Sequence, residues 1–303
     1  MGDKIIGIDI GGTNLRVSLI ENYKIKQYIK IRTPREKSAF ISELFNLIDK
    51  IITNDVKGIG VASPGPLKDG IIQNPPNLKF LHNFNLKKAL EQRFRKKVVL
   101  ENDAKCVALA ELYLGCKKNN FIILTLGTGV GGGIIINKKL YRGGGYAGEL
   151  GHIILDNGED FESLAASKAL KRLTKEAFGR ELLVNELLKM KNGTYNSLEK
   201  EPSERLRTSV RSFQVNTKEK ARKILDEISM YLGQGIASLI NIFDPEIVVI
   251  AGGIRETGSS FLNMIKKQVE KYSILPKKTK IEWSRLEHPG TLGASLLISE
   301  NIK

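Results

Sequence analysis

Glycine and threonine cluster at two places in the chain, in each case between two runs of β-branched residues. The clusters are Gly11, Gly12 and Thr13, and Gly127, Thr128 and Gly129. Such a sequence predicts a β-hairpin, and glycines at its tip leave backbone N–H groups accessible because no side chain covers them. Two such tips, with threonine hydroxyls beside them, could hold a polyphosphate from two sides.

The second cluster also satisfies the G-x-G-x-x-G pattern through Gly127, Gly129 and Gly132. A dinucleotide-binding fold needs a helix directly after these glycines, because the helix N-terminus faces the pyrophosphate. Here Gly133 leads instead into the strand-like run IIINKKL. The P-loop string G-x-x-x-x-G-K-[ST] does not occur in the sequence. A pair of glycine hairpins is therefore the preferred interpretation.

Asp9 lies in the apolar run that leads into the first cluster, between Ile8 and Ile10. A carboxylate among apolar side chains is costly unless it is paired or binds a cation. One interpretation is a Mg²⁺ ion held through water, because Mg²⁺ keeps much of its hydration. The alternative is a side chain that caps the turn at residues 11–12. The second glycine cluster favours the first interpretation.

Three further polar residues stand out by type and position. Asp103 opens a helix-like segment, where an aspartate is usually an N-cap. Glu149 and His152 lie three residues apart, so their side chains can converge on one pocket. His152 is one of three histidines, and a glycine-flanked histidine in a loop has little apolar core around it.

The elements that position these residues alternate between strand and helix. The sequence predicts an amphipathic helix at 36–54, a short strand at 57–63 and a helix from Asp103. After the second hairpin the chain is helix-rich from 161 to about 241, and the strand EIVVIAGG and a further helix follow. Polar residues at 190–205 predict a loop. Two α/β halves that each open with a glycine hairpin predict a duplicated fold with a cleft between the halves.

Charge limits the classes of partner. The chain has 303 residues with 48 Lys+Arg and 33 Asp+Glu, which gives a formal net charge of +15. This balance raises the hypothesis of a nucleic-acid or acidic-lipid partner. The lysines are scattered, however, and no aromatic residues interleave with them for base stacking. A well-solvated surface is the preferred interpretation, and we expect neither a nucleic-acid nor a membrane partner.

Cysteine content and apolar runs limit the cellular setting. Cys106 and Cys116 cannot build a disulfide framework and lack the CxxC spacing of a structural zinc site. A reducing, cytoplasmic setting is therefore expected. The first apolar run is short and interrupted by Asp9, so no signal peptide is predicted. The longest charge-free stretch, 119–137, holds five glycines and two threonines, which predicts strand, turn and strand rather than a membrane span.

Seven motifs occur in the order expected of one protein family: DIGGTNLRVSLI, GIGVASPGPLKDGIIQNPPNL, LENDAKCVALAELYLG, LTLGTGVGGGIIINKKL, GGGYAGELGHIIL, IVVIAGGIRETG and GTLGASLLI. Through them the chain resembles the ROK family of sugar kinases and related repressors, within the actin-like ATPase superfamily. The resemblance implies a two-lobed, ribonuclease H-like α/β fold with a duplicated hairpin-containing core and an interlobe cleft. It places residues 1–116 and 291–303 in a small N-terminal lobe and residues 117–290 in a large C-terminal lobe.

The resemblance also implies a role for each candidate residue. Asp103 becomes the general base that takes the proton of a sugar hydroxyl as the γ-phosphoryl group of ATP arrives. The sugar-binding residues that it implies are Gly65, Asn77, Asn102, Glu149, His152 and Glu162. For the nucleotide it implies two phosphate turns, an adenosine segment and a Mg²⁺-linked carboxylate, namely Gly11, Gly12 and Thr13; Gly127, Thr128 and Gly129; Gly252 and Gly253; and Asp9, acting through water.

One departure from the family pattern concerns zinc. Many members carry a CxCGxxGC loop after a glycine-histidine pair, with the histidine as an additional zinc ligand. The corresponding segment here, GHIILDNGEDFES, contains no cysteine. Zinc is therefore predicted absent, and packing or hydrogen bonds of Asp156, Glu159 and Asp160 are expected to supply the rigidity.

The expected function is an ATP- and Mg²⁺-dependent hexose kinase that acts on the 6-hydroxyl. Glucose is the first candidate, with N-acetylmannosamine, other aldohexoses or a broad hexokinase specificity as alternatives. A sugar-responsive repressor is a second class, but such repressors carry a DNA-binding helix-turn-helix before the first hairpin, and eight residues precede Asp9. A sugar-binding protein without activity is a third class, which Asp103 and both glycine hairpins disfavour. The resemblance also implies a homodimer or homotetramer.

Overall fold

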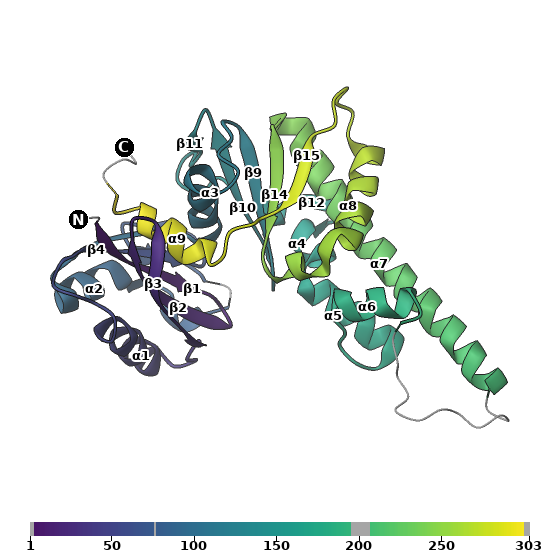
Figure 1. Cartoon of the computed structure of the whole chain (residues 1–303), viewed down its shortest axis with the longest axis horizontal. Helices are drawn as coiled ribbons and strands as arrows, with labels where there is room; N and C mark the ends of the chain where they lie inside the picture. Colours follow the sequence, from purple (N-terminus) through teal and green to yellow (C-terminus); the bar gives the residue numbers. More distant parts are fainter. Residues whose placement is uncertain (1–2, 76, 195–206, 300–303) are drawn as a thin grey trace. The chain divides into compact units, whose positions relative to one another are not determined.

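The computed structural model describes residues 3–75, 77–194 and 207–299. The chain divides into two compact units. Unit 1 comprises residues 1–123, 131–149 and 284–303, and unit 2 comprises residues 124–130 and 150–283. Each unit is therefore built from segments that lie far apart in the sequence, as the chain colours of Figure 1 show.

A five-stranded sheet with the order β3-β2-β1-β4-β8 forms the centre of unit 1. Its strands are β1 (Lys4–Ile10), β2 (Asn14–Glu21), β3 (Lys24–Arg32), β4 (Val56–Ser63) and β8 (Lys97–Asn102). β1, β2 and β3 are antiparallel neighbours, whereas β1, β4 and β8 run parallel. The predicted first hairpin is β1–β2, and the predicted strand at 57–63 is β4, so both predictions are confirmed.

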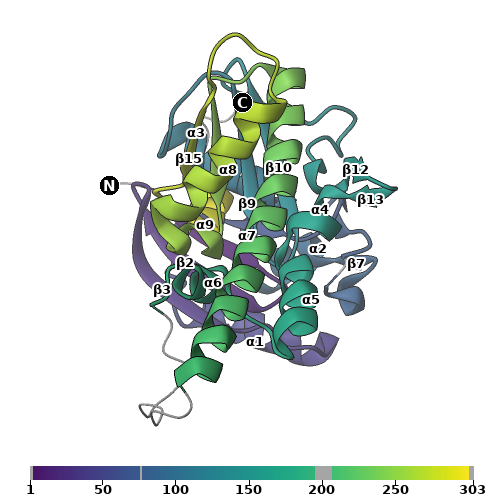
Figure 2. The same ribbon diagram turned by 90° about the vertical axis from the view of Figure 1, so that its right-hand side faces the viewer.

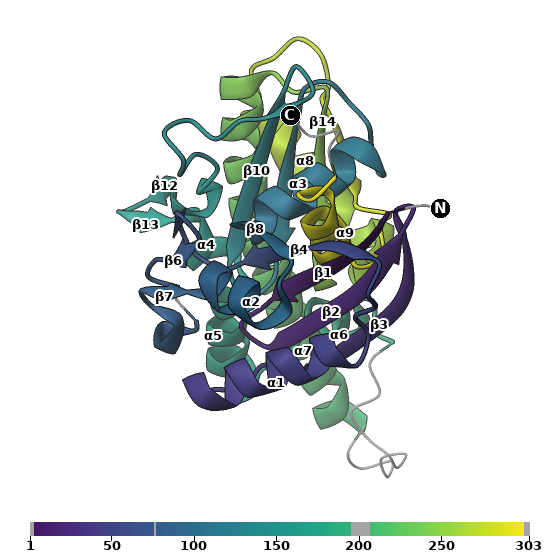
Figure 3. The same ribbon diagram turned by 90° about the vertical axis from the view of Figure 1, so that its left-hand side faces the viewer.

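Four helices pack on this sheet, and Figure 3 shows α1 and α2 beside its strands. They are α1 (Lys37–Asp49), α2 (Leu86–Phe94), α3 (Asp103–Tyr113) and α9 (Pro289–Leu296). Successive side chains of a strand point to opposite faces. Ile6 and Ile8 of β1 share a buried cluster with Phe40 of α1, while Gly7 between them meets Thr291 of α9. The sheet thus has α1 and α2 on one face and α9 with α3 on the other.

α9 approaches the sheet closely because glycine lies at the contact. A Cβ atom on Gly60 of β4 would overlap the main-chain carbonyl of Ala294 in α9. Backbone therefore meets backbone at this point, with no side chain that could move aside. A larger residue at position 60 would have to push the helix off the sheet.

A second, much smaller sheet in unit 1 has the order β5-β6-β7. Its strands have two residues each: β5 (Leu67–Lys68), β6 (Ile71–Ile72) and β7 (Phe84–Asn85). Asn85 ends this sheet and begins α2, because its Oδ1 accepts the Lys88 amide at 2.9 Å as an N-cap.

The other five-stranded sheet has the order β11-β10-β9-β14-β15. Its strands are β9 (Phe121–Leu126), β10 (Val130–Ile136), β11 (Lys139–Leu140), β14 (Ile247–Ala251) and β15 (Lys280–Trp283). β9 and β10 are neighbours, as the second glycine hairpin predicts, and β14 is the predicted strand EIVVIAGG. β14 and β15 are parallel.

Helices make up most of unit 2, as predicted for the region from 161 to 241. They are α4 (Phe161–Ala165), α5 (Ser167–Phe178), α6 (Val184–Lys191), α7 (Arg207–Phe243) and α8 (Gly258–Tyr272). α7 packs against each of the other four, and Figure 2 shows α5, α6 and α8 along it. A short hairpin, β12 (Ile154–Asp156) with β13 (Glu159–Asp160), precedes α4.

The loop predicted at 190–205 is described only in part. α6 still includes Met190 and Lys191, and residues 195–205 lie outside the described residues. Among the helices that the structure describes, none is both long and apolar enough to cross a membrane.

Candidate active site

Two carboxylates meet at the carboxyl end of the parallel strands of unit 1. The register places Asp9 of β1 beside Ala62 of β4, and Ala62 beside Glu101 of β8. Asp103 follows β8 as the first residue of α3, and the charge of Asp9 acts on it. Ligands of α/β proteins bind at this end of the strands, so the topology alone makes the pair a candidate site.

Asp9 is paired with an arginine from the neighbouring strand. Arg16 lies opposite Asp9 in the β1–β2 register, and its Nη1 donates to Asp9 Oδ2 at 2.8 Å. Burial raises the pKa of Asp9, while Arg16 and His288 act in the opposite direction. The Gly11 amide donates to the Asn14 carbonyl at 2.9 Å. The turn is thus closed by main chain, and the Asp9 side chain has a cationic partner.

Asp103 has the environment of a general base. The N-cap of α3 is Asn102, whose Oδ1 accepts the Lys105 amide at 3.2 Å, while Asp103 Oδ1 accepts the Ala104 amide at 2.8 Å. The capping role is therefore filled by Asn102. Burial, and after it the charges of Asp9 and Glu149, raise the pKa of Asp103 to about 7. Such a carboxylate is suited to accept a proton near neutral pH.

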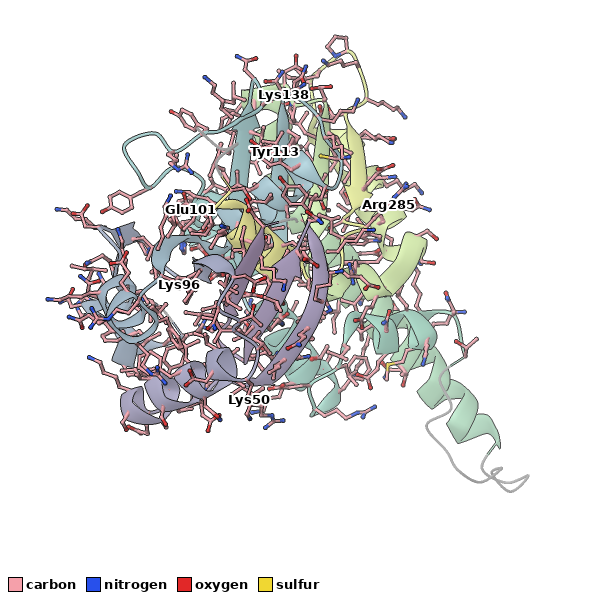
Figure 4. The ribbon with its side chains drawn as sticks, turned by 60° about the vertical axis from the view of Figure 1, so that its left-hand side comes forward. Lys50, Lys96, Glu101, Tyr113, Lys138 and Arg285 are labelled. Atoms are coloured by element: carbon pink, nitrogen blue, oxygen red, sulfur yellow. The ribbon has the colours of Figure 1, made fainter. Side chains whose placement is uncertain are left out.

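The loop that carries Glu149 is tied to the same end of α3. Lys105 is buried, and its Nζ donates to the Gly145 carbonyl at 2.8 Å. Glu101, labelled in Figure 4, accepts Arg142 Nε at 2.9 Å. The loop is thus held at two points, by Lys105 of α3 and by Glu101 of β8. The carboxylate of Glu149 is close enough to act on the pKa of Asp103.

The first glycine turn is fixed by the residue that follows β3. Thr33 is buried and donates with Oγ1 to the Gly11 carbonyl at 2.7 Å. Its amide donates to the Thr13 carbonyl at 3.0 Å. These bonds use the carbonyl oxygens of the turn. The conformation of the turn is therefore fixed by the end of β3 as well as by β1 and β2.

Asn77 lies directly beside this turn, which sequence reasoning did not predict. A Cβ atom on Gly12 would meet the Asn77 Cβ at 3.0 Å, and Arg35 Nη1 donates to the Asn77 carbonyl at 3.3 Å. Gly65, with φ of +79°, lies two residues before β5, and a Cβ on it would meet the Gln73 carbonyl at 2.9 Å. Asn77 is therefore positioned near the predicted phosphate turn, and Gly65 shapes the loop before it.

The second glycine turn, at residues 127–129, is held by α4 and α5. The Gly127 amide donates to the Gly129 carbonyl at 3.0 Å, and the Gly127 carbonyl accepts the Ser167 amide at 3.1 Å. Glu162 of α4 accepts the Val130 amide at 2.8 Å, and its Oε2 fills the space that a Cβ on Gly129 would need. Thr128 is exposed. The structure thus places the Glu162 carboxylate at the second glycine turn.

His152 ends a short 3-10 turn, Leu150–His152, and contacts the hairpin that follows. Its Nδ1 lies 2.8 Å from Asp160 Oδ2, and Asp160 Oδ1 accepts the Ser163 amide at 2.8 Å. On the same hairpin, Asp156 Oδ2 accepts Tyr231 Oη at 3.1 Å. Two of the three carboxylates expected to stiffen this segment therefore make side-chain hydrogen bonds.

The predicted adenosine segment follows β14. Gly252 has φ of +110°, and a Cβ there would overlap the Leu126 carbonyl at the end of β9, so only glycine fits. The space around Gly253 is open within 4 Å of where a Cβ would lie. Because Leu126 directly precedes the second glycine turn, this contact brings the segment and that turn together.

The predicted residues fall into two groups, one in each unit. Unit 1 contains Asp9, Gly11, Gly12, Thr13, Gly65, Asn77, Asn102, Asp103 and Glu149. Unit 2 contains Gly127, Thr128, Gly129, His152, Glu162, Gly252 and Gly253. Within each unit the residues gather at strand ends and at the loops that follow them.

Sequence reasoning missed the partners of these residues: Arg16, Thr33, Glu101, Lys105 and Arg142. Arg16 could have been predicted from the sequence, because in a tight hairpin the residue seven positions after Asp9 lies opposite it on the next strand. The others come from segments that meet only in the folded chain, and their local sequence carries no sign of the contact.

The site of unit 1 fits Mg²⁺ chemistry. Asp9 and Asp103 present carboxylate oxygens at one sheet edge, and Mg²⁺ prefers such oxygens together with water. Within residues 3–75, 77–194 and 207–299, no group of three or more His, Cys, Asp or Glu side chains could hold a metal ion by itself.

Comparison with known sequences gives a consistent result. The sequence profile of the ROK family matches residues 5–301. The glucokinase of Thermotoga maritima is 31% identical over 99% of this chain and 98% of its own length. The xylose repressor of Caldicellulosiruptor bescii is 28% identical over 93% of this chain and 74% of its own length.

Comparison with solved structures agrees with the sequence comparisons. The crystal structure of a ROK family glucokinase from Streptomyces griseus, in complex with glucose and AMPPNP, has a TM-score of 0.78 and 28% identity, covering 97% of this chain and 98% of that one. The α/β architecture is therefore that of this group of structures, the actin-like ATPase fold. The fold class predicted from the sequence is confirmed.

Proposed function

The chain belongs to the ROK family, and on this premise we propose that it transfers the γ-phosphoryl group of ATP to the 6-hydroxyl of an aldohexose, with glucose as the first candidate. Its general class is that of an ATP-dependent sugar kinase. The Thermotoga maritima relative is a glucokinase, and the Streptomyces griseus relative is a glucokinase in complex with glucose and an ATP analogue. Both favour glucose as the acceptor.

The observation that carries the proposal is the environment of Asp103. Phosphoryl transfer to an alcohol needs a group that takes the hydroxyl proton. Asp103 lies at the carboxyl end of the sheet, is not needed as a helix cap, and has a pKa raised to about 7 by burial and by Asp9 and Glu149. A protein that only bound sugar would have no use for a base tuned in this way.

We assign the following roles. Asp103 accepts the proton of the 6-hydroxyl while that oxygen bonds to the γ-phosphorus and the bond to the β–γ bridging oxygen of ATP breaks, which releases ADP. The main-chain amides of residues 12–13 and 128–129 bind the phosphates, while the amides of Gly11 and Gly127 close the two turns. Asp9, oriented by Arg16, would hold Mg²⁺ through water. When bound, Mg²⁺ neutralises charge on the transferred group.

The sugar itself is the finer part of the proposal. Asn102, Glu149, His152 and Glu162 are the proposed hydroxyl ligands, with Gly65 and Asn77 as weaker candidates. Contacts to hydroxyls can be rearranged without changing these residue types. N-acetylmannosamine and other aldohexoses are therefore the alternatives to glucose.

A coupled ADP-release assay with Mg²⁺ tests this proposal. The panel contains glucose, mannose, N-acetylglucosamine, N-acetylmannosamine and fructose. We expect the highest kcat/KM for glucose, with product phosphorylated at carbon 6 by NMR. A higher kcat/KM for a 2-acetamido sugar would make that class of sugar, and not glucose, the substrate. If no sugar caused ADP release, the proposed reaction would be refuted.

A sugar-responsive repressor is the second candidate, because the xylose repressor of Caldicellulosiruptor bescii matches 93% of this chain. A repressor must bind sugar and DNA but needs no general base. Selection of a specific operator from a random DNA pool at physiological salt would favour this class. Catalytic turnover lost in Asp103→Asn would favour the kinase.

A further inference from the structure

Asp160 contacts two predicted parts of the sugar site at once. It is the last residue of β13 and the N-cap of α4. Its Oδ1 accepts the Ser163 amide at 2.8 Å, which fixes the first turn of α4. Its Oδ2 lies 2.8 Å from Nδ1 of His152. One carboxylate therefore connects the helix to the histidine.

The carboxylate determines which histidine nitrogen carries the proton. Burial raises the pKa of Asp160, but hydrogen bonds from Ser163 and His152 outweigh that effect and leave the pKa below its ordinary value. An ionised carboxylate can only accept hydrogen bonds. His152 Nδ1 must then be the donor, so in the neutral ring the acceptor lone pair lies on Nε2.

The same residue also orients the helix that carries Glu162. Glu162 lies two residues after the cap and accepts the Val130 amide of the second glycine turn at 2.8 Å. The His152 side chain is 62% exposed, whereas that of Asp160 is 23% exposed. The ring is thus largely accessible, and the hydrogen bond to Asp160 fixes the direction of its Nδ1 edge.

We propose that Asp160 is a positioning residue for phosphoryl transfer: it holds His152 in the Nδ1–H tautomer, so that Nε2 accepts a hydrogen bond from a sugar hydroxyl. This inference rests on the proposed function, because it assigns His152 to the acceptor sugar. The residue acts through His152 and α4, and it does not touch the reacting atoms.

Asp160→Asn is the decisive variant. Asparagine caps helices as well as aspartate does, so α4 keeps its first turn. Its amide, however, presents an N–H donor to His152 Nδ1, and this favours the opposite tautomer with the proton on Nε2. A hydroxyl that donated to Nε2 would then lose its acceptor.

We expect the KM for sugar to rise about 10- to 100-fold in Asp160→Asn, since a misdirected hydrogen bond in a binding site costs on the order of one to two factors of ten. The KM for ATP and the melting temperature should change little. Asp160→Ser keeps a capping hydroxyl but cannot reach His152, so it should show a smaller increase in sugar KM.

A spectroscopic measurement separates positioning from capping. Long-range ¹H–¹⁵N correlation spectra of histidine side chains distinguish the tautomers, and the chain has three histidines, so His152→Gln assigns the signal by its disappearance. We expect Nδ1–H in the unaltered protein and Nε2–H in Asp160→Asn. Glu159→Gln, an exposed neighbour on the same hairpin, should change neither the spectrum nor the sugar KM.

The outcomes are distinguishable from failure of the proposed function. An unchanged tautomer, or a reversed tautomer with unchanged sugar KM, would overturn the role of Asp160 while the kinase assignment stood. An unchanged sugar KM in His152→Gln would remove His152 from the sugar site and overturn the positioning role with it. If no sugar were phosphorylated by the unaltered protein, the proposed function would fail, and sugar titrations followed by the same spectra would then decide whether Asp160 directs His152 to a ligand.

Discussion

The carboxylate of Asp103 is partly buried and lies close to the charges of Asp9 and Glu149, which together raise its pKa to about 7. Ionising this group in the folded protein therefore costs free energy that ionisation in the unfolded chain does not cost. The arrangement is useful to a base, which must hold the proton that it takes from an alcohol. The ionised form that acts as the base is therefore also the form that lowers the stability of the fold.

Asp103→Asn should lower kcat by about 10²- to 10⁴-fold, the usual contribution of a general base. It should also raise the free energy of unfolding at pH 8, by up to about 4 kcal/mol for a pKa raised from 3.8 to about 7. Kinetics and thermal unfolding at pH 8 check both effects. A variant that loses stability, or that keeps full turnover, would contradict the assignment.

The raised pKa of Asp103 determines how both stability and activity change with pH. Between about pH 4 and pH 7 the folded protein keeps a proton on Asp103 that the unfolded chain releases, so this group makes stability fall as pH rises through that range. The base is active only when ionised. We expect kcat/KM to rise tenfold per pH unit below about 7 and to level off above it. A flat profile from pH 5 to 8, measured with saturating Mg²⁺, would exclude Asp103 as the titrating group.

Sequence chemistry pointed to Asp9, and the family resemblance pointed to Asp103, but neither predicted their surroundings. A carboxylate in an apolar run is conspicuous whatever its partner is. The partner, Arg16, could have been predicted from the spacing of a tight β1–β2 hairpin, which places it opposite Asp9. The hydrogen bond between Lys105 and Gly145 joins segments 40 residues apart, and nothing in either segment predicts it.

Among the elements, α9 packs against its neighbours through close backbone contacts at glycine, of which Gly60 is one. Gly60→Ala should reduce the free energy of unfolding by about 3 kcal/mol, because its Cβ would overlap a main-chain carbonyl that cannot rotate away. Gly144→Ala is the matched control, since no atom lies within 4 Å of the added Cβ. Urea unfolding of both variants is the measurement, and equal stabilities would show that α9 shifts at little cost.

The β12–β13 segment gives a prediction about metal. Asp160 and Asp156 link it to His152 and Tyr231 by hydrogen bonds. We therefore expect a zinc-selective chelator to leave the rate unchanged, while EDTA abolishes it and Mg²⁺ restores it. Loss of activity with the zinc-selective chelator, reversed by added Zn²⁺, would contradict the prediction that zinc is absent.

Long and strongly patterned elements were predictable, and very short ones were not. The alternation of β1 and β2 and the apolar stripe of α1 extend over enough residues to be recognised. β5, β6 and β7 have two residues each, which is too short for alternation to show. They form because the loop from Gly65 to α2 folds onto itself, and that is a tertiary effect.

For the molecule as a whole, the positive charge is distributed over separate segments rather than concentrated in one patch. Lys50, Lys96 and Lys138, labelled in Figure 4, come from the end of α1, the segment before β8 and the β10–β11 turn. We expect binding to random DNA at low salt, because the net charge is +15, and its loss near 0.2 M salt. Fluorescence anisotropy across a salt series measures this, and affinity that persists at 0.3 M would indicate a dedicated nucleic-acid surface.

The position of α9 has a consequence for biosynthesis. Its partners β1 and β4 precede Pro289–Leu296 in the chain, so they leave the ribosome before that helix does. Until α9 has emerged, the surface around Gly7 and Gly60 is not covered by that helix. Nascent polypeptides stalled before residue 289 should accordingly aggregate or recruit chaperones, because β1 and β4 reach their mature packing only after α9 has emerged.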